Sequence, residues 1–226
     1  MVYNAYVAKY MGNDTPKRNI ATFDADIEKY GVGSKVHTSL VILNECYDMF
    51  PQHEHAISEL ENEIRWIGNQ WGSELIEKKI ENILKLDAAK NLCTIEQVLA
   101  AAYPRQATAV SFSREVADQL TLILYGEEGN GTNEANASKH IFWSAYTTSE
   151  IGQIYTRLFT NAHEFGWHSE NRNDPEAMKM DLHNNQRGRF LGSLDTWKDI
   201  LTLVMNDIAE GNAAILVDGK SVLNRR

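Results

Sequence analysis

Apolar side chains recur at three- and four-residue steps through most of this sequence. In the clearest segment, residues 54–71, the apolar positions keep to one helical face: Ile57, Leu60, Ile64, Ile67 and Trp71. A helix with one apolar face has to bury that face against another element. The alternating pattern that predicts β-strands is scarce. The spacing therefore predicts a mainly α protein, built as a single multi-helix domain.

Local signals place further elements around this segment. The spacing predicts a helix over residues 36–50 and another that begins at Ser73. A helix from Thr94 is expected to end at Pro104, because proline lacks the amide hydrogen that a continuing helix needs. Loose alternation over residues 107–112 suggests a short strand.

A further helix and a turn signal lie beyond these elements. Ser113 is the expected N-cap of a helix that ends at Tyr125. Close to the C-terminus, Asp218 and Gly219 separate the apolar runs 213–217 and 221–223. An Asp-Gly pair between such runs is typical of a tight β-hairpin. We therefore expect one small C-terminal β-hairpin.

A polar, glycine-rich stretch over residues 127–133, EEGNGTN, is the best candidate for a linker. It divides the expected single domain, residues 1–226, into a helical scaffold half over 1–126 and a motif-bearing half over 133–226. The same stretch could equally be a loop that lines the functional site.

The motif-bearing half gathers polar side chains at helical spacing. A first helix would place Asn136 and His140 on the same face as Trp143. A second helix, with Ser149 as its N-cap, delivers His163 and Glu164 near its end. A polar loop from Gly166 to Asn173 follows, and Asp174 and Pro175 then open a third helix.

The third helix carries the strongest site signal in the sequence. Asp181, Asn185 and Arg189 fall on the same arc as Met178 and Leu182. Apolar residues normally turn inward, so this arc carries polar groups into the protein, where they must be paired. Such polar groups could form a catalytic site. They could also form a purely structural hydrogen-bond network.

Three motifs in this half resemble a known family. They are Asn-Ala-x-x-His-x-x-Trp at 136–143, Ala-His-Glu at 162–164, and Met-Asp-Leu-His-Asn-Asn-x-x-Gly-Arg at 180–189. They resemble a poorly characterised family of bacterial domains that occur alone or at the C-termini of polymorphic toxins and contact-delivered effectors. The resemblance implies an antibacterial effector toxin, with a cognate immunity protein and a secretion-system carrier as partners.

Two chemistries fit the polar residues. His140, His163 and Asp181 could bind one divalent metal ion, with zinc the best match, and activate a bound water. In a metal-free site, His140 or His163 would act as general base, oriented by Asp181 or Glu164. Supporting side chains would steady an anionic intermediate: Asn136, Asn185 and Arg189. Adjacent helix positions diverge by about 100°, so His163 and Glu164 cannot easily ligate one ion.

Composition limits the possible partners. The formal net charge of −9 argues against nucleic acid, and in the motif-bearing half the tight basic cluster before the C-terminus is Arg187 with Arg189. Cys46 and Cys93 are expected to be buried thiols. No transmembrane segment or signal peptide is expected, so the protein would be made in the bacterial cytoplasm and exported by another route.

These observations converge on a hydrolase that acts on a bacterial cell-envelope component, either peptidoglycan or phospholipid. The effector role within this hypothesis comes from the family resemblance. The alternative is a non-enzymatic helical interaction protein, in which the polar motifs are a structural hydrogen-bond network and the amphipathic helices are a binding surface.

Overall fold

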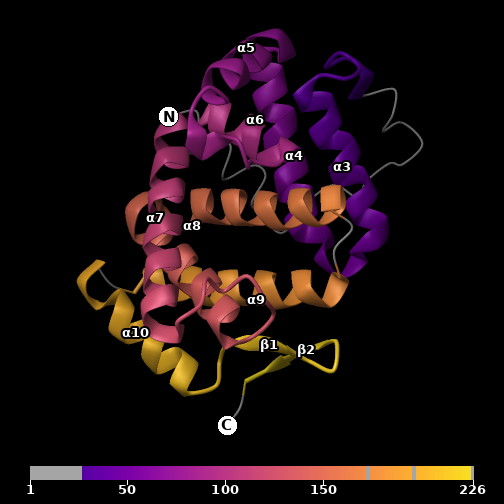
Figure 1. Cartoon of the computed structure of the whole chain (residues 1–226). Helices are drawn as coiled ribbons and strands as arrows, with labels where there is room; N and C mark the ends of the chain where they lie inside the picture. The colour runs from indigo at the N-terminus through magenta and orange to yellow at the C-terminus, as the bar shows by residue number, and fades with distance from the viewer. Residues whose placement is uncertain (1–26, 172–173, 195–196, 225–226) are drawn as a thin grey trace. The chain divides into compact units, whose positions relative to one another are not determined.

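The computed structural model describes residues 27–171, 174–194 and 197–224 (Figure 1). Within these ranges the chain forms eight α-helices, two short 3-10 helices and one two-stranded antiparallel sheet. The prediction of a mainly α protein with a C-terminal β-hairpin is confirmed. By its internal contacts, the chain divides into two compact units, Met1–Ala102 and Tyr103–Arg226. The expected single domain with halves at 1–126 and 133–226 stays a prediction.

Over its described residues, from 27 to 102, the first unit forms four α-helices, and the helices predicted from residues 36, 54, 73 and 94 onward are confirmed. Their apolar faces form its core: Val36, Leu40 and Leu43 on one helix, and Ile57, Leu60, Ile64 and Ile67 on the next, are fully buried. The elements are α3 (Lys35–Met49), η1 (Pro51–His53), α4 (Glu54–Trp71), α5 (Ser73–Ile83), η2 (Asp87–Ala89) and α6 (Thr94–Ala102).

The second unit carries the polar motifs. In Figure 1, α9 lies close to α8, and the hairpin lies beside α9. The elements are α7 (Pro104–Tyr125), α8 (Glu134–Asn171), α9 (Pro175–Gly192), α10 (Trp197–Ala209), β1 (Ala214–Val217) and β2 (Lys220–Leu223).

Helix α7 corrects two predictions. Residues 107–112 are helical rather than a strand, and Ser113 lies inside α7 rather than at its N-cap. Pro104 is the first residue of this helix, where a missing amide hydrogen costs no hydrogen bond. The pattern was misleading because the buried face of α7 combines Ser113 and Thr121 with Val110 and Ala117. Because these two hydroxyl residues interrupt the apolar face, the three- and four-residue spacing typical of a helix is not apparent in the sequence.

Helix α8 bends sharply at Gly152, where φ is 78° and ψ is 163°. The expected break at Ser149 is therefore three residues early, and the Ser149 hydroxyl donates a hydrogen bond to the Tyr146 carbonyl. The expected loop from Gly166 is also wrong, because α8 continues to Asn171. Only glycine readily adopts the backbone conformation found at Gly152.

The predicted start of α9 is confirmed, and so is the hairpin turn. Asp174 accepts a hydrogen bond from the Glu176 amide, and Pro175 is the first helical residue. In the hairpin, Asp218 and Gly219 have φ of 50° and 72°. Both values are positive, as a type I′ turn requires.

Hydrogen bonds from outside the hairpin reach both of its edges. Asn184 on α9 accepts a hydrogen bond from the Ala214 amide at 2.8 Å and donates one to the Ala214 carbonyl at 2.9 Å. The Leu216 amide donates to the Thr132 carbonyl in the loop before α8. The Ser221 amide on β2 donates to the Glu176 carboxylate at 2.8 Å. The hairpin is thereby fixed to α9 and to this loop.

Candidate active site

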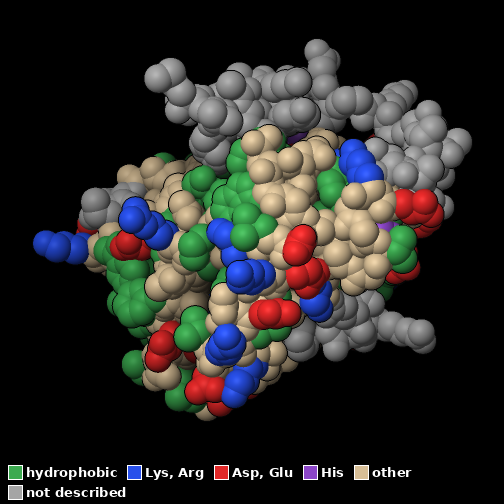
Figure 2. Space-filling model, turned by 90° about the horizontal axis from the view of Figure 1, so that it is seen from above, with side chains coloured by type: hydrophobic (Ala, Val, Ile, Leu, Met, Phe, Trp, Pro, Cys, Tyr) green, Lys and Arg blue, Asp and Glu red, His purple; other side chains and the backbone are tan. Residues whose placement is uncertain are grey.

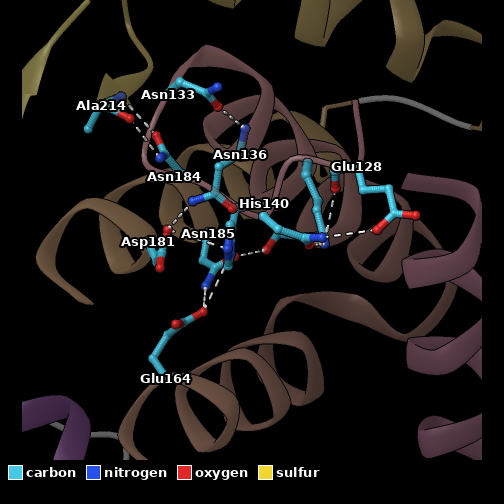
Figure 3. Close-up of polar contacts among 12 residues, drawn as sticks. Glu128, Asn133, Asn136, His140, Glu164, Asp181, Asn184, Asn185 and Ala214 are labelled. Atoms are coloured by element: carbon cyan, nitrogen blue, oxygen red, sulfur yellow. Dashed lines mark hydrogen bonds and ion pairs between the residues drawn. The ribbon is translucent and has the colours of Figure 1, made fainter. Parts of the chain in front are cut away.

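Five of the predicted site residues meet in one buried cluster of the second unit (Figure 3). Asn136 and His140 come from α8 before its bend, and Glu164 comes from α8 after it. Asp181 and Asn185 come from α9, one helical turn apart. The inward polar arc predicted for α9 therefore faces polar partners on α8.

His140 lies between two carboxylates. Its Nε2 lies 3.3 Å from Oδ1 of Asp181. Its Nδ1 lies 3.2 Å from Oδ1 of Asn185 and 3.4 Å from Oε1 of Glu164. The imidazole thus connects α9 with the part of α8 that follows the bend.

The Asn185 amide determines which nitrogen of His140 carries a hydrogen. Asn185 Nδ2 donates to Oε1 of Glu164 at 2.7 Å, since a carboxyl oxygen accepts hydrogen bonds. The Asn185 Oδ1 then faces His140 and also accepts from the Ser144 hydroxyl at 2.9 Å. Nδ1 of His140 must therefore be the donor to Asn185. Nε2 is the nitrogen that faces Asp181.

Solvent lies closer to the Asp181 side of the cluster. Asn185 and Glu164 are 0% and 2% exposed, whereas Asn136, His140 and Asp181 are each 7–8% exposed. Asn136 Nδ2 donates to Oδ1 of Asp181 at 3.1 Å and holds that carboxylate next to the imidazole. A water molecule would therefore reach Nε2 of His140 more easily than Nδ1.

The bend at Gly152 makes this cluster possible. His140 and Glu164 are separated by 24 residues, which would span about 36 Å in a straight helix. Their side chains nevertheless approach to 3.4 Å. The two parts of α8 must therefore fold back on one another at Gly152.

Two glycines of α9 allow its close approach to α8. A Cβ added at Gly188 would lie 2.3 Å from the Ile141 carbonyl oxygen, and one added at Gly192 would lie 2.2 Å from the Ala145 carbonyl oxygen. Larger residues would separate the two backbones. Short side chains such as Ser144 and Asn185 can meet because the helices are this close.

The other two predicted site residues lie beside the cluster. The His163 ring meets the Trp143 ring edge-on, with centroids 5.3 Å apart. Arg189 donates from Nη1 to the Thr160 hydroxyl at 2.9 Å. These contacts place His163 against an aromatic ring and give Arg189 a partner on α8.

Ser144 belongs to the cluster but was missed in the sequence. It lies one helical turn after His140, on the same face of α8, so its spacing could have indicated it.

Two other motif residues form hydrogen bonds with the hairpin or with the residues just before it. Asn184 bonds Ala214, and Nε2 of His183 lies 2.9 Å from the Asn212 carbonyl oxygen.

The basic pair noted in the sequence is engaged within the second unit. Arg187 forms an ion pair with Asp207, and Arg189 bonds Thr160. On the face drawn in Figure 2, acidic and basic side chains are interspersed. That face therefore offers no continuous basic track of the kind that follows a phosphate backbone.

In the part of the chain that the structure describes, no three His, Cys, Asp or Glu side chains are grouped so as to hold a metal ion. The divalent ion suggested for His140, His163 and Asp181 stays a prediction. None of the described helices combines the length and apolar character needed to span a bilayer.

A comparison with protein-family models identifies the domain. The model described as "Domain of unknown function (DUF6973)" matches residues 97–212, just over half of the chain. The chain belongs to this family. The DUF6973 match contains the whole cluster, together with His163 and Arg189, so the polar motifs lie inside the shared domain. A search of curated proteins and a search of solved structures found no match.

Proposed function

We propose that this DUF6973 protein is a hydrolase in which His140 is the general base. The observation that carries the proposal is the position of its imidazole between Glu164 and Asp181. A histidine oriented at one nitrogen by acceptors, with its second nitrogen nearer solvent, is arranged to take a proton from water. The Nδ1 contacts with Asn185 and Glu164 supply that orientation.

The proposed reaction gives a role to five residues of the cluster. A water bound next to Nε2 loses its proton to His140 while its oxygen attacks the substrate's carbonyl carbon or phosphorus. The imidazolium that forms is stabilised by Glu164 at Nδ1 and by Asp181 at Nε2. His140 then returns the proton to the leaving group. Asn136 and Asn185 act by positioning the two carboxylates.

We propose a bacterial cell-envelope component, either peptidoglycan or phospholipid, as the substrate. The support is the resemblance of the motifs to domains of polymorphic toxins and effectors. The net charge of −9 also disfavours a nucleic acid substrate. On this proposal the protein acts as an antibacterial effector and is neutralised by an immunity protein.

A second function is favoured by the burial of Asn185. Its side chain is 0% exposed, and it bonds Glu164, Ser144 and His140 within the protein. A buried network whose polar groups are all hydrogen-bonded can have a purely structural role, which is to hold helices together. The protein would then be a non-enzymatic interaction module.

The test is product release by the purified full chain from peptidoglycan sacculi and from phospholipid vesicles. Asp181→Asn and Glu164→Gln keep the shape of the side chain but remove its charge. Hydrolysis is expected to fall about 10²–10⁴-fold, the usual contribution of an oriented general base. Asp207→Asn is the matched control, since it removes another buried carboxylate of the same unit, outside the cluster. Its activity should stay near that of the unmodified protein.

Two results would contradict the proposal. One is Asp181→Asn protein that is folded and fully active. The other is unmodified protein that releases no product from either substrate, while Asp181→Asn lowers the melting temperature, which would favour the structural network. Elemental analysis and chelator treatment test the metal separately. One bound ion lost in His140→Ala, with chelator-sensitive activity, would replace the metal-free mechanism.

A further inference from the structure

The loop between α7 and α8 contains the only Asn-Gly pair in the sequence, Asn130–Gly131. Residues 126–133 form neither helix nor strand, and both members of the pair are exposed. The side-chain amide of an asparagine can be attacked by the backbone nitrogen of the residue that follows it. Glycine presents this nitrogen with the least steric hindrance, because it has no Cβ. The pair is therefore a place where the chain can react with itself.

The fold does not require glycine at position 131. The atoms nearest to a Cβ added at Gly131 belong to the Asn133 side chain and lie 3.8 Å away, which is an ordinary contact. The φ angle of Gly131 is not positive, in contrast to that of Gly129, which is 63°. Alanine would therefore fit at position 131 without strain, and it would hinder only the approach of the backbone nitrogen.

Two charged side chains contact the Asn130 amide. The Lys139 Nζ donates a hydrogen bond to Oδ1 of Asn130 at 3.3 Å, and Asn130 Nδ2 donates to Oε2 of Glu128 at 3.0 Å. Lys139 also forms an ion pair with Asp118 of α7 at 2.9 Å, and its side chain is 15% exposed. A cation held by its own ion pair thus lies at the oxygen of this amide, and a carboxylate lies at its nitrogen.

We propose that Asn130 is a self-modification site, at which the chain deamidates through a cyclic imide. The Gly131 nitrogen attacks Cγ of Asn130 and loses its proton, while negative charge develops on Oδ1. The bond between Cγ and Nδ2 then breaks, and Nδ2 leaves as ammonia with a proton equivalent to the one that Gly131 lost. Water opens the imide at one of its two carbonyl groups and gives either aspartate or isoaspartate.

The contacts of the Asn130 amide favour both stages of imide formation. The Lys139 ammonium lies where negative charge develops on Oδ1, and a donor in that position stabilises a tetrahedral intermediate. The Glu128 carboxyl group lies beside Nδ2, where it can pass a proton to the departing nitrogen. The folded loop therefore assists the reaction rather than only exposing the pair to water.

The products change what the loop can hold. A carboxylate at position 130 is attracted to Lys139 but repelled by Glu128, and isoaspartate also lengthens the backbone by a methylene group. Thr132 in the same loop accepts a hydrogen bond from the Leu216 amide of the hairpin. The isoaspartate product should therefore weaken this bond and release one edge of the hairpin.

Peptide mapping by mass spectrometry measures the reaction in the full chain, kept at mildly alkaline pH and sampled over days. Asn133, which is exposed in the same loop but is followed by Glu134, is the internal comparison. Asn130 should be converted at least about tenfold faster than Asn133, and Gly131→Ala should remove most of this difference. Equal rates at the two asparagines, or an intact Asn130, would overturn the proposal.

A lysine variant tests the assistance by the folded loop. Lys139→Met should slow conversion of Asn130 about tenfold, less than for a buried oxyanion-hole donor because this loop is exposed. Lys198→Met is the matched control, since it removes an exposed lysine of α10, and it should leave the rate unchanged. If Lys139 only restrained the loop, its loss would speed conversion, and that result would overturn its assigned role.

Hydrogen exchange tests the consequence for the hairpin. The Leu216 amide should exchange faster in aged protein than in fresh protein, in proportion to the isoaspartate that has formed. Gly131→Ala protein kept for the same time should show no such change. Unaltered exchange at Leu216 in protein that has been converted to isoaspartate would overturn the predicted release of the hairpin edge.

Discussion

Replacing Gly152 by alanine should destabilise the second unit through backbone strain alone. A Cβ added at Gly152 meets no atom within 4 Å, so no steric clash with neighbouring side chains contributes. The backbone there has φ of 78° and ψ of 163°, in a region that is essentially restricted to glycine. Holding another residue in such a conformation costs about 1–3 kcal/mol. We expect the free energy of unfolding to fall by that amount.

The chain cannot relieve this strain by straightening α8. Alanine is about 1 kcal/mol more favourable than glycine inside a helix, so local preference would favour a continuous helix. A continuous helix, however, would place Glu164 about 36 Å from His140 and break its bond to Asn185. The loss of this buried network and of the packing between α8 and α9 exceeds the local gain. The bend should therefore persist, under strain.

Urea unfolding followed by circular dichroism measures the effect. Gln153→Ala is the control, because Gln153 is exposed and follows the bend directly. Its unfolding free energy should change by less than about 0.5 kcal/mol. Gly152→Asn is the sharper variant. Asparagine tolerates left-handed helical conformations with ψ near 47°, but a ψ of 163° lies outside that region, so asparagine should not rescue stability. A Gly152→Ala protein as stable as the unmodified chain would refute the reasoning.

Three further changes have defined outcomes. Gly188→Ala forces its Cβ against the Ile141 carbonyl and should cost about 1–3 kcal/mol in urea unfolding, despite its better helix propensity. Asn184→Ala removes both bonds to Ala214 and should lower the unfolding free energy by about 1–3 kcal/mol, with faster amide exchange in the hairpin. Burial raises the pKa of Tyr146 above its ordinary value of 10.0. Its contribution to stability is therefore full below that pH and is lost as the pH rises through the folded-state pKa. Tyr146→Phe should accordingly lose less stability than the unmodified chain in alkaline urea titrations.

The sequence predicts best those helices whose burial is apolar and continuous. Helix α4 begins and ends where its spacing predicts, because its buried face is formed mainly by Ile and Leu. For α7 the sequence pattern instead predicts a strand followed by a shorter helix, because hydroxyl side chains occupy half of the buried face of this helix. Apolar spacing in the sequence identifies a helix only where the buried face is apolar. A buried face that mixes polar and apolar residues gives no clear helical period.

The site could be predicted as a set of residues but not as a geometry. Polar residues on an apolar arc indicate that Asp181 and Asn185 need partners, and both have them. Which histidine supplies a partner depends on the reversal at Gly152, which lies about three helical turns along the chain from both His140 and Glu164. A single glycine in a helical pattern does not predict the direction of a bend. The sequence alone therefore does not separate His140 from His163, whereas the structure places His140 between Glu164 and Asp181.

The bonds at the edges of the C-terminal hairpin also limit how the protein can aggregate. A two-stranded sheet normally presents unpaired amide and carbonyl groups to which another strand can add, as in domain swapping or fibril growth. Here Asn184, Thr132 and Glu176 take up the amides of Ala214, Leu216 and Ser221. Adding a strand to either edge would first require breaking these bonds. Unpaired strand edges should therefore appear only when α9 or the loop before α8 moves away, which makes local unfolding in this region the step that would precede self-assembly through β-strands.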